Sequence, residues 1–227
     1  MNIVFYDPKN WFQGIKESEK FLEIFIEQVE QQISSFISDY ELNKTTVLEE
    51  RYDLEGYKGF DDSNHYSVKR IVKVEFPNYH RKSAFITLHS FLDVQLNNLC
   101  DLFKSQKKLD LSVYDIKSDN GHIGRATKYL TKVVGLDWDC GIGVWSEINS
   151  LRTLRNKIVH EDGKITEGNK KLINYISNSQ YLDGDKNSEK LIQNIVITSD
   201  QFLNYALSTY INLCEEFYTA ISNVGSS

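Results

Sequence analysis

The chain has 227 residues, of which 41% are hydrophobic and 26% are charged, and this balance is that of a globular protein rather than a disordered or fibrous one. Its net charge of −6 argues against broad non-specific binding to nucleic acid, and its three cysteines, Cys100, Cys140 and Cys214, fit neither a disulfide framework nor a zinc knuckle. Because no apolar run is long enough to span a bilayer and the start does not resemble a signal peptide, we expect a cytoplasmic protein with reduced thiols and no membrane partner.

Hydrophobic residues recur at helical spacing in five segments, and Pro8 and Pro77 are the only prolines of the chain. The segment after Pro77 is apolar nearly all round between Ala84 and Leu96, which predicts a helix at the centre of the fold. His89 lies within this run, and we interpret it as a hydrogen-bonded core histidine. The predicted helices span 15–40, 81–104, 123–134, 144–160 and about 201–222, the last after a capping box that starts at Thr198.

The segments between these helices are polar and rich in turn-forming residues. Residues 41–79 contain two glycines and an Asp-Asp-Ser-Asn turn signal, and the alternating apolar residues of 68–76 predict a strand, so we expect an irregular insertion with hairpin character. Residues 164–190 are predicted to be turn-rich, and 194–197 to form a short strand. The pattern predicts an all-α fold in a single domain, 1–227, built as a bundle of four to five helices with a small irregular or β insertion.

Glycines mark both ends of the helix predicted for 144–160. Gly141 and Gly143 precede it, and two interpretations stay open for them. One is a turn that cradles phosphate, and the simpler one is a hinge or helix start, since no Gly-Lys-Ser/Thr follows. Gly163 comes just after the helix and is predicted to end it in a left-handed conformation.

Positive charge gathers in the second half of the chain. Residues 121–172 hold nine Lys or Arg and six Asp or Glu, a local charge of +3 in a chain of −6. A patch that attracts phosphate and ordinary solvated helix faces both explain this excess. Under the first interpretation, the basic residues predicted to contact RNA are Arg125, Arg152, Lys157 and Lys164.

The commonest catalytic chemistries leave no pattern in the sequence. No Cys and His pair has zinc-ligand spacing, and the acidic residues are scattered or adjacent, as in Asp61-Asp62 and Glu161-Asp162, whereas a two-metal nuclease needs them to converge. None of the thiols has a marked activating neighbour, and no P-loop or dinucleotide fingerprint occurs. We therefore predict no metal and no cofactor.

The helix predicted for 144–160 ends on three polar residues, Arg155, Asn156 and His160. Arg155 lies four residues after Leu151, beside the apolar stripe that we expect to be buried, and a charge at the margin of a core needs an anionic partner. No acidic residue at helical spacing supplies one, so the partner comes from elsewhere in the fold, from another chain or from a ligand such as phosphate. The apolar stripe consists of Leu151, Leu154 and Ile158.

Asn156 and His160 share a helix face, whereas Arg155 lies about 140° from His160 around an ideal helix. One copy therefore gives a poorly converged site, and two copies facing each other in a symmetric dimer would bring two Arg and two His together. That set suits metal-free RNA cleavage, because imidazole can take the 2′-hydroxyl proton and give one to the leaving 5′-oxygen while guanidinium stabilises the phosphate. Asn156 would orient His160 or hold a phosphate oxygen.

At these residues the chain resembles the HEPN superfamily, whose motif is Arg, four to six residues and then His at the end of a helix in an all-α protein. The resemblance implies a HEPN-like bundle and a dimeric, metal-independent endoribonuclease, with Arg155 and His160 as catalytic residues and Asn156 supporting them. It also implies a toxin or anti-phage defence effector with an antitoxin or regulatory partner. The similarity covers roughly 81–221, including Ser83-Ala84-Phe85, Tyr129-Leu130, Trp145 and Leu151-Arg152-x-Leu154-Arg155-Asn156.

The resemblance has one departure. The variant of this family that is paired with a nucleotidyltransferase antitoxin has a tyrosine two residues after the histidine, where this chain has Asp162. That difference puts this particular pairing in doubt.

Other interpretations of the same residues stay open. Arg155 can pair with carbonyls or a carboxylate, and the helix dipole favours a terminal His160, so the motif also has a purely structural explanation. The chain would then be a non-catalytic dimeric module that binds RNA or protein, which its acidic balance favours. A helical bundle that binds a small molecule is the third alternative.

Overall fold

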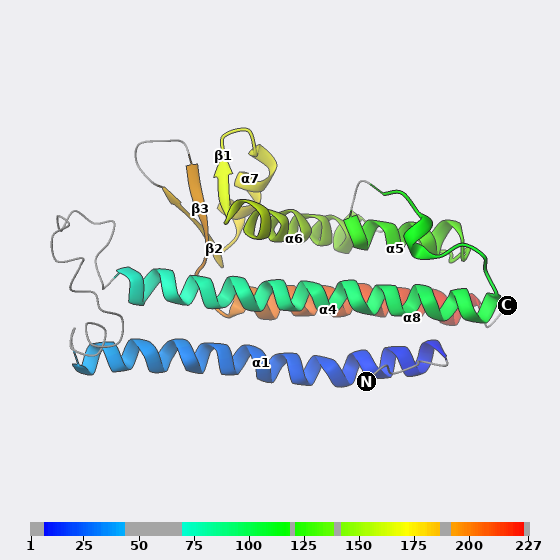
Figure 1. Cartoon of the computed structure of the whole chain (residues 1–227), viewed down its shortest axis with the longest axis horizontal. Helices are drawn as coiled ribbons and strands as arrows, with labels where there is room; N and C mark the ends of the chain where they lie inside the picture. Colours follow the sequence, from blue (N-terminus) through cyan, green and yellow to red (C-terminus); the bar gives the residue numbers. More distant parts are fainter. Residues whose placement is uncertain (1–6, 44–69, 119–120, 139–141, 187–191, 225–227) are drawn as a thin grey trace.

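The computed structural model describes residues 7–43, 70–118, 121–138, 142–186 and 192–224, and most of them are helical (Figure 1). This part of the chain contains six α-helices and a three-stranded antiparallel sheet, which confirms the predicted helical class with a small β addition. The helices are α1 (Pro8–Asn43), α4 (Phe76–Lys107), α5 (Gly121–Lys132), α6 (Ile142–Glu161), α7 (Lys170–Asn178) and α8 (Gln201–Val224), with the π-helix η2 (Ile71–Glu75) and the 3-10 helix η3 (Val113–Asp115). The strands are β1 (Lys164–Thr166), β2 (Leu182–Lys186) and β3 (Ile192–Ile197), in the order β1-β3-β2.

Helix α4 is the centre of the fold, as its apolar sequence predicts. It contacts α1, α5, α6 and α8 as well as β3. In Figure 1, α1 forms one layer, α4 and α8 the next, and α5 and α6 a third, with the sheet and α7 beside one end of α6. The position of α6 is therefore set by its packing on α4 and α8.

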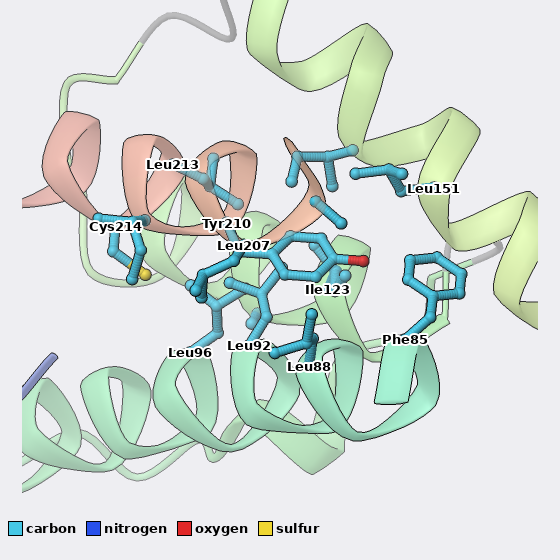
Figure 2. Close-up of a cluster of buried hydrophobic side chains, with 14 of the residues drawn as sticks. Phe85, Leu88, Leu92, Leu96, Ile123, Leu151, Leu207, Tyr210, Leu213 and Cys214 are labelled. Carbon is cyan, nitrogen blue, oxygen red and sulfur yellow. The ribbon is translucent and has the colours of Figure 1, made fainter. Parts of the chain in front are cut away.

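The core between these layers is a continuous cluster of buried side chains. Figure 2 shows Leu88 and Leu92 of α4 close to Tyr210 of α8, with Leu151 of α6 and Ile123 of α5 in the same cluster, and all five are buried. Each fully buried aliphatic side chain contributes about 1.5–3 kcal/mol relative to exposure, so this cluster dominates the stability of the bundle. None of the described helices is long and apolar enough to cross a membrane.

Helix α1 begins earlier than predicted. The carboxylate of Asp7 accepts the backbone N–H of Asn10 at 2.7 Å, and Pro8 occupies the first helical position, where its missing N–H has no cost. Trp11 is buried in this extra stretch and donates its indole N–H to the carbonyl of Gln95 at 3.0 Å. This contact joins the start of α1 to α4.

The strand predicted for 68–76 is wrong for the residues that the structure describes, because η2 runs directly into α4. Val72 and Phe76 lie four residues apart and share a helix face. Val72 is buried, and the Phe76 ring stacks on Phe36 of α1 with 4.0 Å between centroids. Packing against α1 therefore prevails over the β propensity of these residues.

The π-helical geometry of η2 is explained by the proline that follows it. Pro77 has no N–H to donate, and its ring would crowd the carbonyl one α-turn earlier. A wider π turn just before it relieves that crowding. The rest of the insertion predicted for 41–79 lies outside the described residues, apart from 41–43, which continue α1.

The sheet and one further helix form in the segment predicted to be turn-rich. β3 is the central strand, pairs antiparallel with β1 and β2, and contains the predicted strand 194–197. Helix α7 was not predicted, and it raises the number of helices above the four or five expected. Its apolar residues Leu172 and Ile176 are four apart and buried, but nine residues are too few for helical periodicity to be distinguished from a turn.

The capping box predicted at Thr198 is also wrong. The backbone N–H and the hydroxyl of Thr198 both donate to the carbonyl of Tyr181, at 3.0 and 2.9 Å, so this residue fastens the end of β3 to the start of β2. Ser199 instead accepts the N–H of Gln201 with its hydroxyl oxygen at 3.3 Å, and α8 begins there.

Two polar side chains of α4 hold the end of β3. Asn78 donates its amide N–H to the carbonyl of Ile195 at 3.2 Å and accepts the N–H of Ile197 at 3.0 Å, as a neighbouring strand would. Arg81 binds both carboxylate oxygens of Glu30 of α1 at 2.7 Å and donates to the carbonyl of Ile197 at 3.3 Å. The sheet, α4 and α1 are thereby joined at one place.

Replacement of Asn78 by alanine tests this join. Asn78→Ala leaves the N–H of Ile197 and the carbonyl of Ile195 without these side-chain partners in a buried place, so we expect a loss of about 2–4 kcal/mol in the free energy of unfolding measured by urea denaturation. Ser90→Ala on the same helix removes only an exposed hydroxyl and is expected to cost less than about 0.5 kcal/mol. Equal effects of the two changes would contradict the role given to Asn78.

Candidate functional site

The second half of α6 places the three residues that the sequence singles out. Leu151, Leu154 and Ile158 are buried, as their spacing predicts, and this fixes the rotation of the helix on α4 and α8. Arg155 and Asn156 are half-buried beside this stripe, and His160 is exposed on the last turn.

Arg155 reaches from the interior toward the surface. Its Nε is buried and makes no hydrogen bond within the described part of the chain. Its Nη1 donates to the side-chain oxygen of Asn156 at 3.2 Å. Asn156 thus contacts the guanidinium, and its predicted role of orienting His160 or holding a phosphate oxygen stays a prediction.

The inner side of Arg155 faces a group of polar residues between the helices, which we call the interhelical polar cluster and define as His89 and Asp93 of α4, Arg155 of α6 and Tyr210 of α8. His89 is buried and lies 2.9 Å from the hydroxyl of Tyr210 through its Nδ1. This confirms that His89 is a hydrogen-bonded core histidine. Asp93 and Arg155 are half-buried and act electrostatically on this pair.

Burial and charge both act on the cluster. Burial, with smaller effects from Arg155 and Arg152, lowers the pKa of His89 to about 4. His89 is therefore neutral at neutral pH. Burial raises the pKa of Asp93, while His122 and Arg155 act to lower it. The pKa of Tyr210 is raised well above its usual value by burial and by Asp93, so the phenol stays protonated.

Asp93 of α4 is a carboxylate on which Arg155 acts electrostatically, after the larger effects of its own burial and of His122. No ion pair joins Asp93 and Arg155 among the described residues, so the kinds of partner that the sequence leaves open for Arg155 stay open. The match is incomplete, because Asp93 Oδ1 and Arg155 Nε are both buried and neither has a hydrogen-bond partner among the described residues. Arg155 therefore keeps donor capacity that the fold does not use.

Arg155 and His160 belong to different surroundings within one copy. Arg155 donates a hydrogen bond to Asn156 and acts electrostatically on His89, and His160 lies on the exposed end of the helix. Within the described residues, no hydrogen bond, ion pair or ring contact joins the two side chains. This separation follows from their angular positions on the helix, about 140° apart.

The end of α6 is fixed by residues on either side of His160. Gly163 has φ +75° and Asp162 has φ +54°, and the N–H of Gly163 donates to the carbonyl of Lys157 at 2.9 Å. Gly163 therefore ends the helix in the left-handed conformation that the sequence predicts. A side chain at 163 would also meet Nζ of Lys82, which lies 2.8 Å from where its Cβ would be.

Lys82 is a buried cation of α4 that packs against this helix end. Its ammonium lies 5.9 Å from the centre of the Tyr79 ring. Burial lowers the pKa of Lys82, and Asp162 and Glu75 act to raise it. Lys82 was not singled out from the sequence, because nothing in the pattern of α4 indicates that it faces the end of α6.

The basic residues predicted to contact RNA belong to α5, α6 and β1. Arg152 borders a pocket between α6 and α7, and Lys157 pairs with Glu161 at 2.6 Å. Lys164 is exposed at the start of β1, and Arg125 is a half-buried residue of α5 with a buried Nε. Only Arg152 acts electrostatically on the same buried histidine as Arg155.

Sequence reasoning missed Asp93 and Tyr210 as neighbours of Arg155. His89 and Asp93 lie four residues apart on one helix, which puts them on one face, and this spacing was the available signal. Their approach to Arg155 depends on how α4 packs against α6, which no local pattern encodes.

Two of the three thiols lie in the core. Within the described ranges, no three side chains of His, Cys, Asp or Glu gather closely enough to hold a metal ion. Cys100 and Cys214 are free and buried, and burial raises the pKa of Cys214 to about 12, while Cys140 lies outside the described residues.

The chain was compared with protein-family models, curated proteins and solved structures. No protein-family model matches the chain, and neither a curated protein nor a solved structure matches it.

His89 gives the fold a pH dependence that can be measured. The unfolded chain protonates this histidine below a pH of about 6.5, whereas the folded chain does so only near pH 4, so stability falls as the pH falls between these values. Relative to His89→Gln, wild type should lose up to about 3 kcal/mol of unfolding free energy between pH 7 and pH 4, measured by urea denaturation at each pH. Ser90→Ala, which changes an exposed hydroxyl of the same helix, should follow wild type. If His89→Gln has the pH profile of wild type, the assignment fails.

Proposed function

We propose that this chain is a metal-independent endoribonuclease with a HEPN-like fold, which cuts RNA at a site formed by Arg155 and His160 across the interface of a homodimer. The observation that carries the proposal is the pair itself. Arg155 has a partly buried guanidinium with an unused donor, and His160 has an exposed imidazole. Both lie on the last two turns of α6, a helix whose apolar face is buried. These are the two groups that RNA cleavage without a metal requires.

The dimer in this proposal follows from the separation of the two side chains. Arg155 and His160 point about 140° apart, so a single helix cannot direct both at one phosphate. A second copy related by a two-fold axis would bring the partner's His160 toward Arg155, and the reverse. Val159, which is 42% exposed beside His160, offers an apolar contact for such an interface.

The proposed reaction uses groups that this chain has. The neutral imidazole of one His160 takes the proton of a ribose 2′-hydroxyl, and the 2′-oxygen attacks the adjacent phosphorus. The bond from phosphorus to the 5′-oxygen breaks, the imidazolium of the second His160 gives that oxygen a proton, and a 2′,3′-cyclic phosphate remains. Arg155 stabilises the charge that develops on the phosphate oxygens, with Asn156 orienting its guanidinium.

In the cell, we propose a toxin or an anti-phage defence effector that an antitoxin or regulatory partner keeps in check. Unrestrained cleavage of RNA harms the cell that makes the enzyme, so a restraining partner belongs to the same proposal. DNA would be spared, because it has no 2′-hydroxyl.

One observation favours a non-catalytic dimeric module as the second candidate. Arg155 interacts with the buried carboxylate of Asp93, and this interaction gives the residue a structural role that needs no substrate. His160 is exposed at a helix end, where the helix dipole favours a cation. The two candidates differ in what happens when His160 is removed.

The first experiment measures cleavage of single-stranded RNA in EDTA. Wild type is expected to leave 2′,3′-cyclic phosphate ends, and His160→Ala, which changes only an exposed side chain, should lower the rate by about 10²–10⁴-fold without loss of stability. Arg155→Lys keeps the charge but loses the forked geometry, and it should also cleave more slowly. His122→Ala serves as the matched control. Cleavage that survives His160→Ala rules out the mechanism, and inert wild type favours the binding module.

The second experiment tests whether the site is shared between copies. We expect a homodimer by sedimentation equilibrium. An equal mixture of wild-type and His160→Ala subunits should keep about a quarter of wild-type activity, because only a quarter of the dimers then carry both His160 side chains, the base and the acid. A strict monomer, or a mixture that keeps half of the activity as independent subunits would, shows that the composite site does not exist.

A further inference from the structure

A polar groove lies on the other side of α6 from the interhelical polar cluster. It is bounded by α6 and α7. Its volume of about 380 Å³ lies in the range of small-ligand sites. Its lining includes two cations, Arg152 of α6 and Lys171 of α7, and three short polar residues of α6, Asn149, Ser150 and Thr153.

The wall that α7 contributes is held in place. Tyr175 of α7 lines the groove and donates its hydroxyl to Oε1 of Glu147 of α6 at 2.6 Å. Burial and the hydrogen bond to Glu147 raise the pKa of Tyr175, so the hydroxyl keeps its proton. The bond joins α7 to α6 and keeps the groove at a fixed width.

The chemistry of the lining suits an anion. None of the residues that border the groove is acidic, although the Glu147 carboxylate lies one hydrogen bond away behind Tyr175, and Lys171 is exposed. The hydroxyls of Ser150 and Thr153 donate to carbonyls one turn back, at 3.1 and 2.8 Å. Such hydroxyls can rotate toward a phosphate oxygen with little change in the helix.

The face of α6 that borders the groove also carries His160, beyond the residues that line the groove. Ser146, Thr153 and His160 are seven residues apart, so each lies within about 20° of the next around the helix axis. The rise between Thr153 and His160 is about 10.5 Å. Asn156 and Lys157 lie on the same face between them, so polar side chains line the whole path from the groove to the exposed histidine.

We propose that this groove is a subsite for a phosphate group of single-stranded RNA, with Lys171 and Arg152 as its cationic partners. The identity of the ligand as RNA, a few nucleotides from the scissile bond, rests on the proposed function. The groove itself rests on its own residues. Lys171 is the new assignment, since the sequence indicated no contact by this residue or by α7.

The test compares two adjacent lysines of α7. Lys171 lines the groove, and Lys170 is an exposed neighbour that does not. Binding of a labelled 2′-O-methyl oligonucleotide, which cannot be cleaved, is measured by fluorescence anisotropy over a series of salt concentrations in EDTA. Lys171→Gln should weaken binding on the order of fivefold and reduce the slope of log affinity against log salt by about 1, and Lys170→Gln should leave both near wild type.

Two further arms identify the source of the phosphate and the place of binding. Ser150→Leu fills the groove with an apolar side chain and should weaken oligonucleotide binding as much as Lys171→Gln does. AMP is titrated against the bound oligonucleotide, and weak competition is expected, because one phosphate makes only part of the contacts. If AMP binds in a manner that depends on Lys171 while the oligonucleotide does not, the groove is a free-nucleotide site and the RNA assignment is overturned.

The outcomes separate this proposal from the ribonuclease. Equal effects of Lys171→Gln and Lys170→Gln overturn the subsite, whatever the cleavage assay gives. If the wild-type protein does not cleave RNA but binds the oligonucleotide in a manner that depends on Lys171, the subsite is supported and the ribonuclease proposal is contradicted. Circular dichroism of each variant checks that the fold is intact, which the exposure of both lysines leads us to expect.

Discussion

Burial of α4 on nearly all sides is the constraint on which the rest of the molecule depends. Leu88, Leu92 and Leu96 are fully buried, and α1, α5, α6 and α8 all pack on this one helix. The residues of α6 are positioned by the packing of this helix against α4 and α8. Loss of packing at α4 would therefore move every candidate site residue at once.

Polar groups inside such a core are costly unless they are matched, and here the matching is uneven. His89 and Tyr210 satisfy each other, whereas Asp93 and Arg155 attract each other while each keeps a buried atom without a hydrogen bond. A fully satisfied arginine would serve the fold and nothing else. The incomplete match leaves the buried Nε of Arg155 without a hydrogen-bond partner among the described residues, and proteins keep such local mismatches mainly at functional sites.

The sequence predicts those features of the structure that short-range residue spacing determines. The apolar stripe of α6 and the left-handed end at Gly163 follow from the sequence of those segments, and the structure agrees with them. The failures share a cause, which is contact with distant parts of the chain. Val72 was assigned to a strand by its alternation, yet packing against α1 makes the segment helical. Lys171 lines the groove only because α7 packs against α6, and α7 is too short to be predicted from sequence periodicity. The proximity of Asp93 to Arg155 likewise needs the three-dimensional arrangement of two helices.

The lysine that packs against Gly163 has a consequence for recognition at the end of α6. With Lys82 filling the space beside a glycine in the left-handed conformation, the backbone after His160 turns in one direction and has little room to adopt another. A molecule that contacts His160 then has to order two side-chain torsions rather than a loop, at a cost of about 0.5–1.5 kcal/mol in lost rotamer freedom. The backbone that carries the imidazole is in this sense preorganised, and the residue responsible, Lys82, belongs to a different helix, α4.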